Sequence, residues 1–378
     1  MDREQLDRFP LNGTFELTAR CNLSCKMCLV RIDNKRMAEL GGRERTAEEW
    51  IRMAQEVKEA GTIGLLLTGG EPMLRPDFIQ IYKAIAQMGF MLTLYTNATL
   101  VTEEIMEVLT EFPPHNIGIT AYGASSKTYE KVCGNANAYN RMLEGVEQLK
   151  RLPSKLSIRT TIIKDNLEDI DEISEWAYSL DPNIDFGISR IVIKPVRGGI
   201  ADVEACRLSP EENVSLIEKT ETKYTVNPFI GYLKENTIEI ADYLKLKEEK
   251  KEEQVYRRED LIKHNKFTLY GCNAGIYSYT ISWDGKLIGC QLLGDCWTYP
   301  FDNKFQQAWD EYPKKVNLQP KPEVCRGCKL SCNACPATRL AETGNLSGFS
   351  EYLCNESKLK SDMNRKLITL MQNHYKKG

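Results

Sequence analysis

The sequence has few histidines and no long apolar run, and each absence narrows the functions open to the chain. Only His115, His264 and His374 occur among its 378 residues, so acid–base catalysis built on histidine has few candidates. No apolar stretch approaches the roughly 20 residues of a membrane-spanning helix, and no signal peptide precedes Thr14. We therefore expect a cytoplasmic protein with no membrane partner.

Strong charge of one sign is also lacking. The formal net charge is −3, which gives no reason to expect nucleic acid or an anionic membrane surface as a partner. Repeats and low-complexity segments are absent. Apolar residues make up 42% of the chain, enough for a sizeable core, and the length corresponds to two or three domains of roughly 150 residues.

Cysteine is abundant instead. Thirteen cysteines are an odd number and a high count, and without a secretion signal they indicate metal ligands in a reducing compartment rather than disulfides. Cys21, Cys25 and Cys28 lie close together, directly after an apolar-alternating run at residues 14–17. Structural zinc and ordinary iron–sulfur clusters take four protein ligands, so three cysteines leave one metal position open. A zinc-binding or purely structural loop remains the alternative.

Apolar strand patterns alternate with helical patterns from residue 14 to about residue 196. Strands are expected at residues 14–17, 63–67, 90–95, 116–121, 157–163 and 186–193. Helices are expected between them, the first over residues 46–60 with a capping box of Thr46 and Glu49. Six strands joined by helical crossovers predict an α/β fold with a parallel sheet, fewer than the eight units of a complete TIM barrel.

Eight of the thirteen cysteines fall within residues 272–354, which predicts a second, metal-bearing domain. The run Cys325-x2-Cys328-x3-Cys332-x2-Cys335-Pro336 is close to the cysteine spacing of bacterial ferredoxins. The zinc alternative requires about 15–20 residues between two Cys-x2-Cys pairs, far more than the gap here. Iron–sulfur clusters are therefore favoured.

The spacing of Cys21, Cys25 and Cys28 resembles the signature of radical S-adenosylmethionine (SAM) enzymes, with Met27 in place of the common aromatic residue. In that family the three cysteines hold a [4Fe–4S] cluster whose fourth iron is chelated by SAM. Gly69, Gly70, Glu71 and Pro72 follow the second expected strand and match the family's motif for the SAM amino group. By themselves they would indicate only a tight turn. The resemblance further implies that SAM contacts the side chains of Asn97, Thr120, Arg159 and Ile193.

The C-terminal cysteines resemble the SPASM extension of these enzymes, a module with two auxiliary [4Fe–4S] clusters. The resemblance assigns one cluster to Cys325, Cys328, Cys332 and Cys354, and the other to Cys272, Cys290 and Cys335. The second cluster has no evident fourth ligand, and Asp295, Cys296, Cys206 or the substrate are candidates. Cys133 is expected to be a buried apolar thiol.

The resemblance implies a partial (β/α)6 TIM-like barrel followed by a small cysteine-rich SPASM domain. We expect a radical SAM barrel at residues 1–199, a helical connector at 200–271, the SPASM domain at 272–354 and a C-terminal helix at 355–378. The tail carries Leu359, Met363, Leu367 and Leu370 at helical spacing, which favours core packing. A charge run over residues 245–260 is expected to be a solvated surface, and no separate leader-binding domain is expected before residue 14.

The activity implied by the resemblance is reductive cleavage of SAM to a 5′-deoxyadenosyl radical that abstracts hydrogen from a substrate. The substrate most often modified by this architecture is a ribosomally made precursor peptide, served by an external donor such as flavodoxin or ferredoxin and, for a long precursor, a separate leader-binding protein. Sulfatase maturation is less favoured because Gln291 replaces that group's aspartate base, and no general base is identified here. Haem or quinone-cofactor synthesis is a further alternative. A non-catalytic iron–sulfur electron carrier or zinc scaffold is the alternative of another class.

Overall fold

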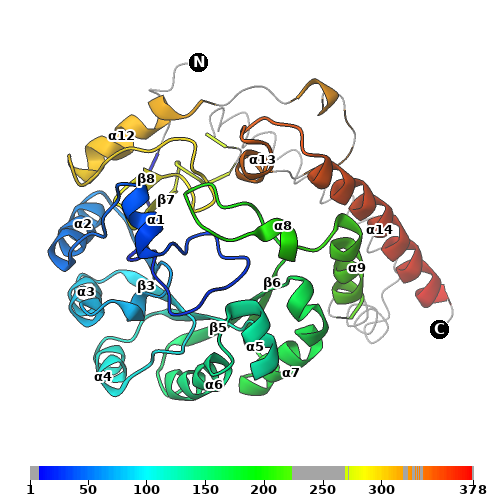
Figure 1. Ribbon diagram of the computed structural model, residues 1–378, viewed down its shortest axis with the longest axis horizontal. Helices are drawn as coiled ribbons and strands as arrows, with labels where there is room; N and C mark the ends of the chain where they lie inside the picture. The colour runs from blue at the N-terminus through cyan, green and yellow to red at the C-terminus, as the bar shows by residue number, and fades with distance from the viewer. Residues whose placement is uncertain are drawn as a thin grey trace.

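The computed structural model describes residues 8–223, 269–270, 272–317, 322–325, 328, 330, 332 and 335–376. One sheet runs through it, with helices around its outer side (Figure 1). The strands are β1 Asn12–Glu16, β2 Gly64–Thr68, β3 Met91–Thr96, β4 Asn116–Thr120, β5 Lys155–Thr161, β6 Asp185–Ser189, β7 Ser278–Ile281 and β8 Leu287–Ile288. The main helices are α1 Asn34–Glu39, α2 Ala47–Glu59, α3 Phe78–Ala86, α4 Glu103–Glu111, α5 Ser126–Cys133, α6 Ala138–Leu149, α7 Ile170–Leu180, α8 Val203–Cys206, α9 Pro210–Glu221, α12 Phe305–Lys315, α13 Pro336–Thr343 and α14 Glu351–Lys376.

The six expected strands are confirmed, and they pair in parallel in the order of the chain from β1 to β6. This is the predicted partial (β/α)6 barrel. Within the barrel, two helices were not predicted, α1 and α5, because both are short and rich in polar residues. The last strand is also shorter than expected, so that Ile193 lies beyond β6.

Local sequence signals explain where the helices begin. Thr46 and Glu49 form the expected capping box before α2. Thr102 caps α4 by accepting a hydrogen bond from the amide of Ile105. α3 begins at Phe78, two residues after Pro76.

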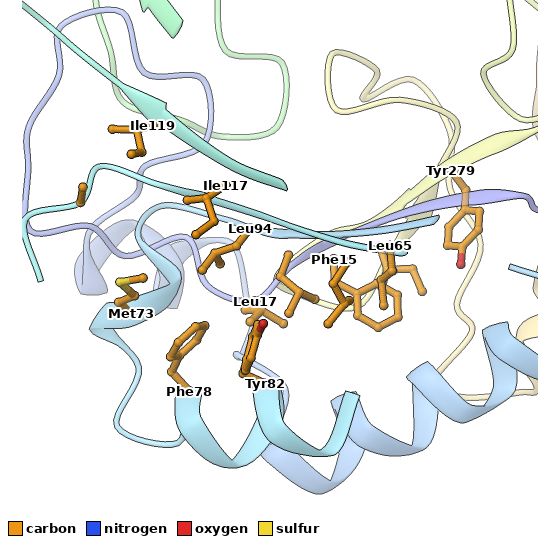
Figure 2. Close-up of a cluster of buried hydrophobic side chains, with 14 of the residues drawn as sticks. Phe15, Leu17, Leu65, Met73, Phe78, Tyr82, Leu94, Ile117, Ile119 and Tyr279 are labelled. Atoms are coloured by element: carbon orange, nitrogen blue, oxygen red, sulfur yellow. The ribbon is translucent and has the colours of Figure 1, made fainter. Parts of the chain in front are cut away.

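Alternation along the strands gives the sheet two different faces. Phe15, Leu17, Leu65 and Leu94 point towards the helices, where Figure 2 shows them beside Phe78 and Tyr82 of α3. Their neighbours in the strands therefore point to the opposite, concave face, which holds polar side chains. These are Glu16, Thr68, Tyr95, Thr120 and Arg159.

The cysteine-rich C-terminal part adds two strands to the barrel sheet. β7 pairs in parallel with β1, and β8 pairs in antiparallel with β7. The hairpin between them turns at Gly285, whose φ of +85° favours glycine and whose place beside the Arg45 guanidinium leaves no room for a Cβ. The segment between Cys272 and Cys290 is thereby attached to the strand that leads into Cys21.

The tail is the last part of one long helix, α14, which also contains Cys354. Leu359, Met363 and Leu367 pack against Val214 and Ile217 of α9, which confirms the predicted core packing for these three. The predicted boundary between residues 354 and 355 falls within α14, and the division into domains stays a prediction. The side chain of Leu370 and the charge run at residues 245–260 lie outside the described residues. Of the helices described, none combines the length and apolarity needed to cross a membrane.

Candidate active site at the ends of the barrel strands

Cys21, Cys25 and Cys28 lie on the loop between β1 and α1, at the carboxyl edge of the parallel sheet. This is the edge where barrels of parallel strands build their sites. The loop is fastened to the end of α5, because the amides of Ser24 and Lys26 donate to the carbonyls of Cys133 and Val132 at 2.8 and 3.0 Å. The unpredicted helix α5 therefore positions the cysteine loop.

Several N–H groups point at the sulfur atoms of this loop. The amide of Leu23 lies 3.4 Å from Cys21 Sγ, the amide of Arg31 lies 3.2 Å from Cys28 Sγ, and Asn97 Nδ2 lies 3.7 Å from Cys21 Sγ. Such donors stabilise negative charge on sulfur. The sequence alone did not indicate them, since two of the three are backbone groups.

Burial raises the pKa of Cys21 to about 12, with further contributions from Glu71, Cys25 and Cys28. Burial likewise raises the pKa of Cys28, while a hydrogen bond with the Cys133 thiol is the main reason why that of Cys25 is raised. Three neighbouring thiols with raised pKa values would remain protonated alone, and a cationic metal centre would displace their protons. This donor set fits an iron–sulfur cluster.

A single metal ion fits less well. Among the residues that the structure describes, no three His, Cys, Asp or Glu side chains are gathered tightly enough to hold one ion. A four-iron cluster places each thiolate on a different iron and so accepts cysteines that are farther apart.

Gly69 and Gly70 follow β2 and lie directly against the start of the cysteine loop. A Cβ on Gly69 would come within 2.3 Å of the Thr18 carbonyl oxygen, and one on Gly70 within 2.2 Å of the Arg20 carbonyl oxygen. The Gly70 amide donates a hydrogen bond to the Thr18 carbonyl at 2.7 Å, and the Glu71 amide donates one to the Arg20 carbonyl at 2.9 Å. Glycine is therefore required here for two loops to meet, in addition to any ligand.

The Glu71 carboxylate is fully buried and bridges the ends of β2 and β3. It accepts hydrogen bonds from the amides of Met73 and Asn97 at 3.1 and 2.8 Å, and from Thr96 Oγ1 at 2.9 Å. Burial raises its pKa to about 7. Pro72 begins a short 3-10 helix directly after it. The predicted contact of this motif with the SAM amino group stays a prediction.

Asn97 belongs to a small network that links β3 to the cysteine loop. Its Nδ2 donates to Asn22 Oδ1 at 2.9 Å, and Asn22 Nδ2 donates to Thr99 Oγ1 at 2.8 Å. The intervening Ala98 has a φ of +57°, a left-handed conformation that is uncommon without glycine and typical of functional sites. Asn22 and Ala98 were missed, because neither carries a motif.

Thr120 and Arg159 are neighbours across β4 and β5. Arg159 donates to both carboxylate oxygens of Asp185, at 3.1 and 2.5 Å, and lies across Gly187, where a Cβ would come within 2.1 Å of its guanidinium. Ile193 is buried just beyond β6. Contacts of Thr120, Arg159 and Ile193 with SAM stay predictions. In this structure the guanidinium of Arg159 is paired with Asp185.

Residues 193–199 join the cysteine loop to the C-terminal part of the chain. Arg197 donates to both oxygens of the buried Glu16 carboxylate, at 2.6 and 2.7 Å, and to the Gln291 carbonyl at 3.0 Å. A Cβ on Gly199 would come within 2.7 Å of the carbonyl of Leu29, next to Cys28. Arg197 was missed, although a glutamate inside an apolar strand signals a buried partner.

Comparison with known proteins then identifies the N-terminal part. Residues 15–177 match the radical SAM superfamily. These residues form a radical SAM domain. Domains of this superfamily use SAM and a [4Fe–4S] cluster, and the match over these residues supports a radical SAM enzyme.

Two curated relatives extend this comparison. An AdoMet-dependent heme synthase from Methanosarcina barkeri is 27% identical over 344 residues, 88% of this chain and 92% of that protein. A PqqA peptide cyclase from Bradyrhizobium diazoefficiens is 28% identical over 172 residues, 46% of this chain and 44% of its own length.

Among solved structures, Streptococcus suis SuiB bound to its precursor peptide SuiA has a similar fold. The TM-score is 0.65 at 17% identity, and the match covers 93% of this chain and 77% of SuiB. The likeness therefore includes the C-terminal part as well as the radical SAM domain. It supports the fold of a partial barrel followed by a C-terminal domain.

Seven of the nine cysteines beyond residue 177 are those that the SPASM resemblance assigned to two clusters. Burial is the main cause that raises the pKa of Cys290, and the Cys335 and Cys272 thiols contribute in the same direction. The other four line one cavity of about 80 Å³, and they are Cys325, Cys328, Cys332 and Cys354. Ser357 Oγ lies 3.3 Å from Cys332 Sγ at the wall of this cavity. The division into two clusters that the SPASM resemblance implied stays a prediction.

The remaining cysteines have other surroundings. Cys206 packs into the barrel core from α8, and Cys296 lies 3.5 Å from the Tyr270 hydroxyl. Asp295 has a buried Oδ1 with no hydrogen-bond partner, and burial raises the pKa of its carboxyl. Cys133 is buried as expected, but its position beside Cys25 was not predicted.

Proposed function

We propose that this chain is a radical SAM enzyme of the SPASM type that modifies a ribosomally made peptide, by forming a cross-link or by another post-translational change. It cleaves SAM reductively to a 5′-deoxyadenosyl radical, which removes a hydrogen atom from the substrate. The single observation that carries the proposal is the loop of Cys21, Cys25 and Cys28. Its thiols lie at the strand ends, with N–H donors directed at the sulfurs of Cys21 and Cys28 and the Gly69–Gly70 turn against the loop.

The chain's own residues divide this work. Cys21, Cys25 and Cys28 hold the cluster, and the motif from Gly69 to Pro72 holds the methionine end of SAM. Asn97, Thr120, Arg159 and Ile193 hold the remainder of the cofactor. When bound, the cluster and SAM supply an electron and a carbon-centred radical, chemistry that no side chain provides. The protein orients the partners on the concave face of the sheet and excludes water there.

A peptide substrate is supported by the comparisons. SuiB, whose fold is similar over 93% of this chain, was solved with its precursor peptide, and the Bradyrhizobium relative is a peptide cyclase. Two auxiliary [4Fe–4S] clusters, on Cys272, Cys290 and Cys335 and on the four cysteines that line the 80 Å³ cavity, are supported by the grouping of these thiols. They would accept the electron that leaves when a product radical closes to a bond.

Partners and location belong to the same proposal. The reductive step requires an external electron donor such as flavodoxin or ferredoxin, and a long precursor would be presented by a separate leader-binding protein. All thirteen cysteines are free of disulfides, which supports a reducing cytoplasm.

Tetrapyrrole chemistry is the second candidate. The Methanosarcina heme synthase aligns with 88% of this chain, whereas the peptide cyclase aligns with about half. A haem-forming enzyme would use the same radical SAM domain, so the two candidates differ in substrate alone.

The test is anaerobic incubation of the reconstituted enzyme with SAM and dithionite, followed by mass spectrometry. We expect 5′-deoxyadenosine and methionine in equal amounts, and neither from Cys25→Ala. Adding short peptides encoded beside the gene should yield a peptide of altered mass, whereas haem synthesis would require a porphyrin substrate and leave peptides unchanged. If iron-loaded enzyme forms no 5′-deoxyadenosine, the proposed activity is wrong.

A further inference from the structure

A cavity of about 490 Å³ lies beside the last barrel strand and adjoins the predicted SAM site, because Arg159 and Ile193 are part of its lining. One wall is the end of β6 and the residues that follow it, up to Ile193. The other walls are α9, α13 and α14, helices that lie on the β6 side of the barrel in Figure 1. This volume is in the range of sites for small ligands or short peptide segments.

The cavity lies between the two kinds of redox centre. Ile193, predicted to contact SAM, is in one wall. Thr338 on α13 lies in another, three residues after Cys335, and Leu353 on α14 lies next to Cys354. A molecule bound here would be in reach of both the radical SAM site and the auxiliary cysteines.

The charged groups in the walls neutralise one another, with one exception. Arg159 pairs with Asp185, Glu342 pairs with Arg207 at 2.5 Å, and Lys360 pairs with Glu356 at 3.0 Å. Arg190 has no carboxylate partner among the described residues. The cavity therefore presents one uncompensated guanidinium, which suits a carboxylate.

Asn213 supplies a second unsatisfied group. Its side chain lines the cavity from α9 and is only 3% exposed, yet its Oδ1 has no hydrogen-bond partner. A buried amide oxygen without a donor costs free energy, so such an atom in a cavity wall indicates a ligand that brings an N–H group.

The edge of β6 supplies backbone groups. β6 is the last strand of the described sheet and pairs only with β5. The Ser189 carbonyl accepts from the Ile162 amide at 3.0 Å, so alternation in the ladder turns the backbone of Ile188 and Arg190 outward. Neither residue makes a backbone hydrogen bond to another described segment. A free strand edge is a template for an added strand.

Resting on the proposed function, we propose that an extended segment of the peptide substrate binds in this cavity. Its backbone pairs with the free edge of β6 and donates an N–H to Asn213, and an acidic side chain of the peptide binds Arg190. The site selects peptides with a carboxylate near the residue that is modified. It also holds that residue between the predicted SAM site and the auxiliary cysteines.

Two pools of random pentapeptides, acetylated and amidated, test this: one has glutamate at the centre and the other glutamine. Each is passed over immobilised, reconstituted full-length enzyme with SAM, and retention is measured by mass spectrometry. Wild type should retain the glutamate pool about tenfold better. Arg190→Gln should abolish this preference. Asn213→Leu and Ile188→Pro should reduce retention of both pools, since proline removes the outward N–H of the edge.

Ile188→Val is the matched control and should behave as wild type, because it keeps the backbone N–H. Iron content and formation of 5′-deoxyadenosine without peptide are measured for every variant and should not change. A preference that survives Arg190→Gln, or equal retention of both pools by wild type, overturns the proposed site. Absence of 5′-deoxyadenosine from iron-loaded wild type would instead overturn the proposed function, so the two failures are distinguishable.

Discussion

Arg197 donates hydrogen bonds to both oxygens of the Glu16 carboxylate. Glu16 is 0% exposed, so the ion pair is shielded from water on the carboxylate side. Glu16 is the last residue of β1, and Cys21, the first cysteine of the loop, follows five residues later. Arg197 also donates to the carbonyl of Gln291, next to Cys290. One ion pair thus holds together the strand that leads to the first cluster and the loop of an auxiliary cysteine.

Removing one member of this pair should be costly. Arg197→Met leaves a buried carboxylate without its partner and should lower the free energy of unfolding by about 3–5 kcal/mol. The double variant Glu16→Gln, Arg197→Met removes both charges and should recover part of that loss. Anaerobic urea denaturation measures all three proteins. Equal stability of wild type and Arg197→Met would show that the pair contributes nothing.

Gly70→Ala should displace the cysteine loop. Its Cβ would lie 2.2 Å from the Arg20 carbonyl, and overpacking of this kind costs about 1–3 kcal/mol. We expect a lower iron content per chain and less SAM binding. Gly61→Ala is the control, because Gly61 has a strained φ of +101° but open space around it. Iron loading that falls equally in both variants would contradict a specific role for Gly70.

The buried Glu71 carboxyl should make the iron-free protein less stable as pH rises. Its pKa is about 7 when folded, against an ordinary value of 4.5, because burial disfavours the charged form. The folded state then holds the proton more tightly than the unfolded state. The stability present below pH 4.5 is lost as pH rises through 7, by about 1.4 kcal/mol for each unit of pKa difference. Denaturation at pH 5 and pH 8 measures this.

Glu71→Gln is the matched variant for that experiment. It keeps the shape of the side chain but cannot ionise, so its stability should change less between the two pH values. A wild type whose stability rises from pH 5 to pH 8 by more than that of Glu71→Gln would contradict the raised pKa.

The two groups of C-terminal cysteines predict which variants lose iron together. Cys325→Ala and Cys354→Ala should each lose about four irons, and their double variant should lose no more, since both belong to one cluster. Combining Cys290→Ala with Cys332→Ala should lose about eight irons. Iron and sulfide analysis gives the result. Cys133→Ala should keep its iron, and full additivity of Cys325→Ala and Cys354→Ala would refute the grouping.

Much of the fold was predictable because its signals are local. Thr46 and Glu49 define a helix start within four residues, and the alternation of Phe15 and Leu17 defines a strand and its buried face. The cysteines of the candidate site could be named because their spacing is itself a motif. The six-strand count followed from the same patterns and agrees with β1 to β6.

The contacts that organise the site could not be predicted from the sequence. Arg197 and Glu16 are 181 residues apart, and no sequence motif near either residue indicates that the two form a pair. The amide donors to Cys21 and Cys28 are backbone groups, which every residue carries. Pairing of β7 with β1 joins Ser278 to Asn12, segments far apart in the sequence, and only the tertiary structure reveals it. Helix α5 was missed because its apolar face is short, although its end anchors the cysteine loop.

The central claim is that the three N-terminal thiols hold an iron–sulfur cluster with one position reserved for SAM. It is tested most directly by electron paramagnetic resonance of the dithionite-reduced protein in which the seven C-terminal cysteines are replaced by alanine, namely Cys272, Cys290, Cys325, Cys328, Cys332, Cys335 and Cys354. We predict one reduced [4Fe–4S] signal whose g-values shift when SAM is added. A signal that SAM leaves unchanged, or no cluster signal at all in the folded protein, would contradict the account.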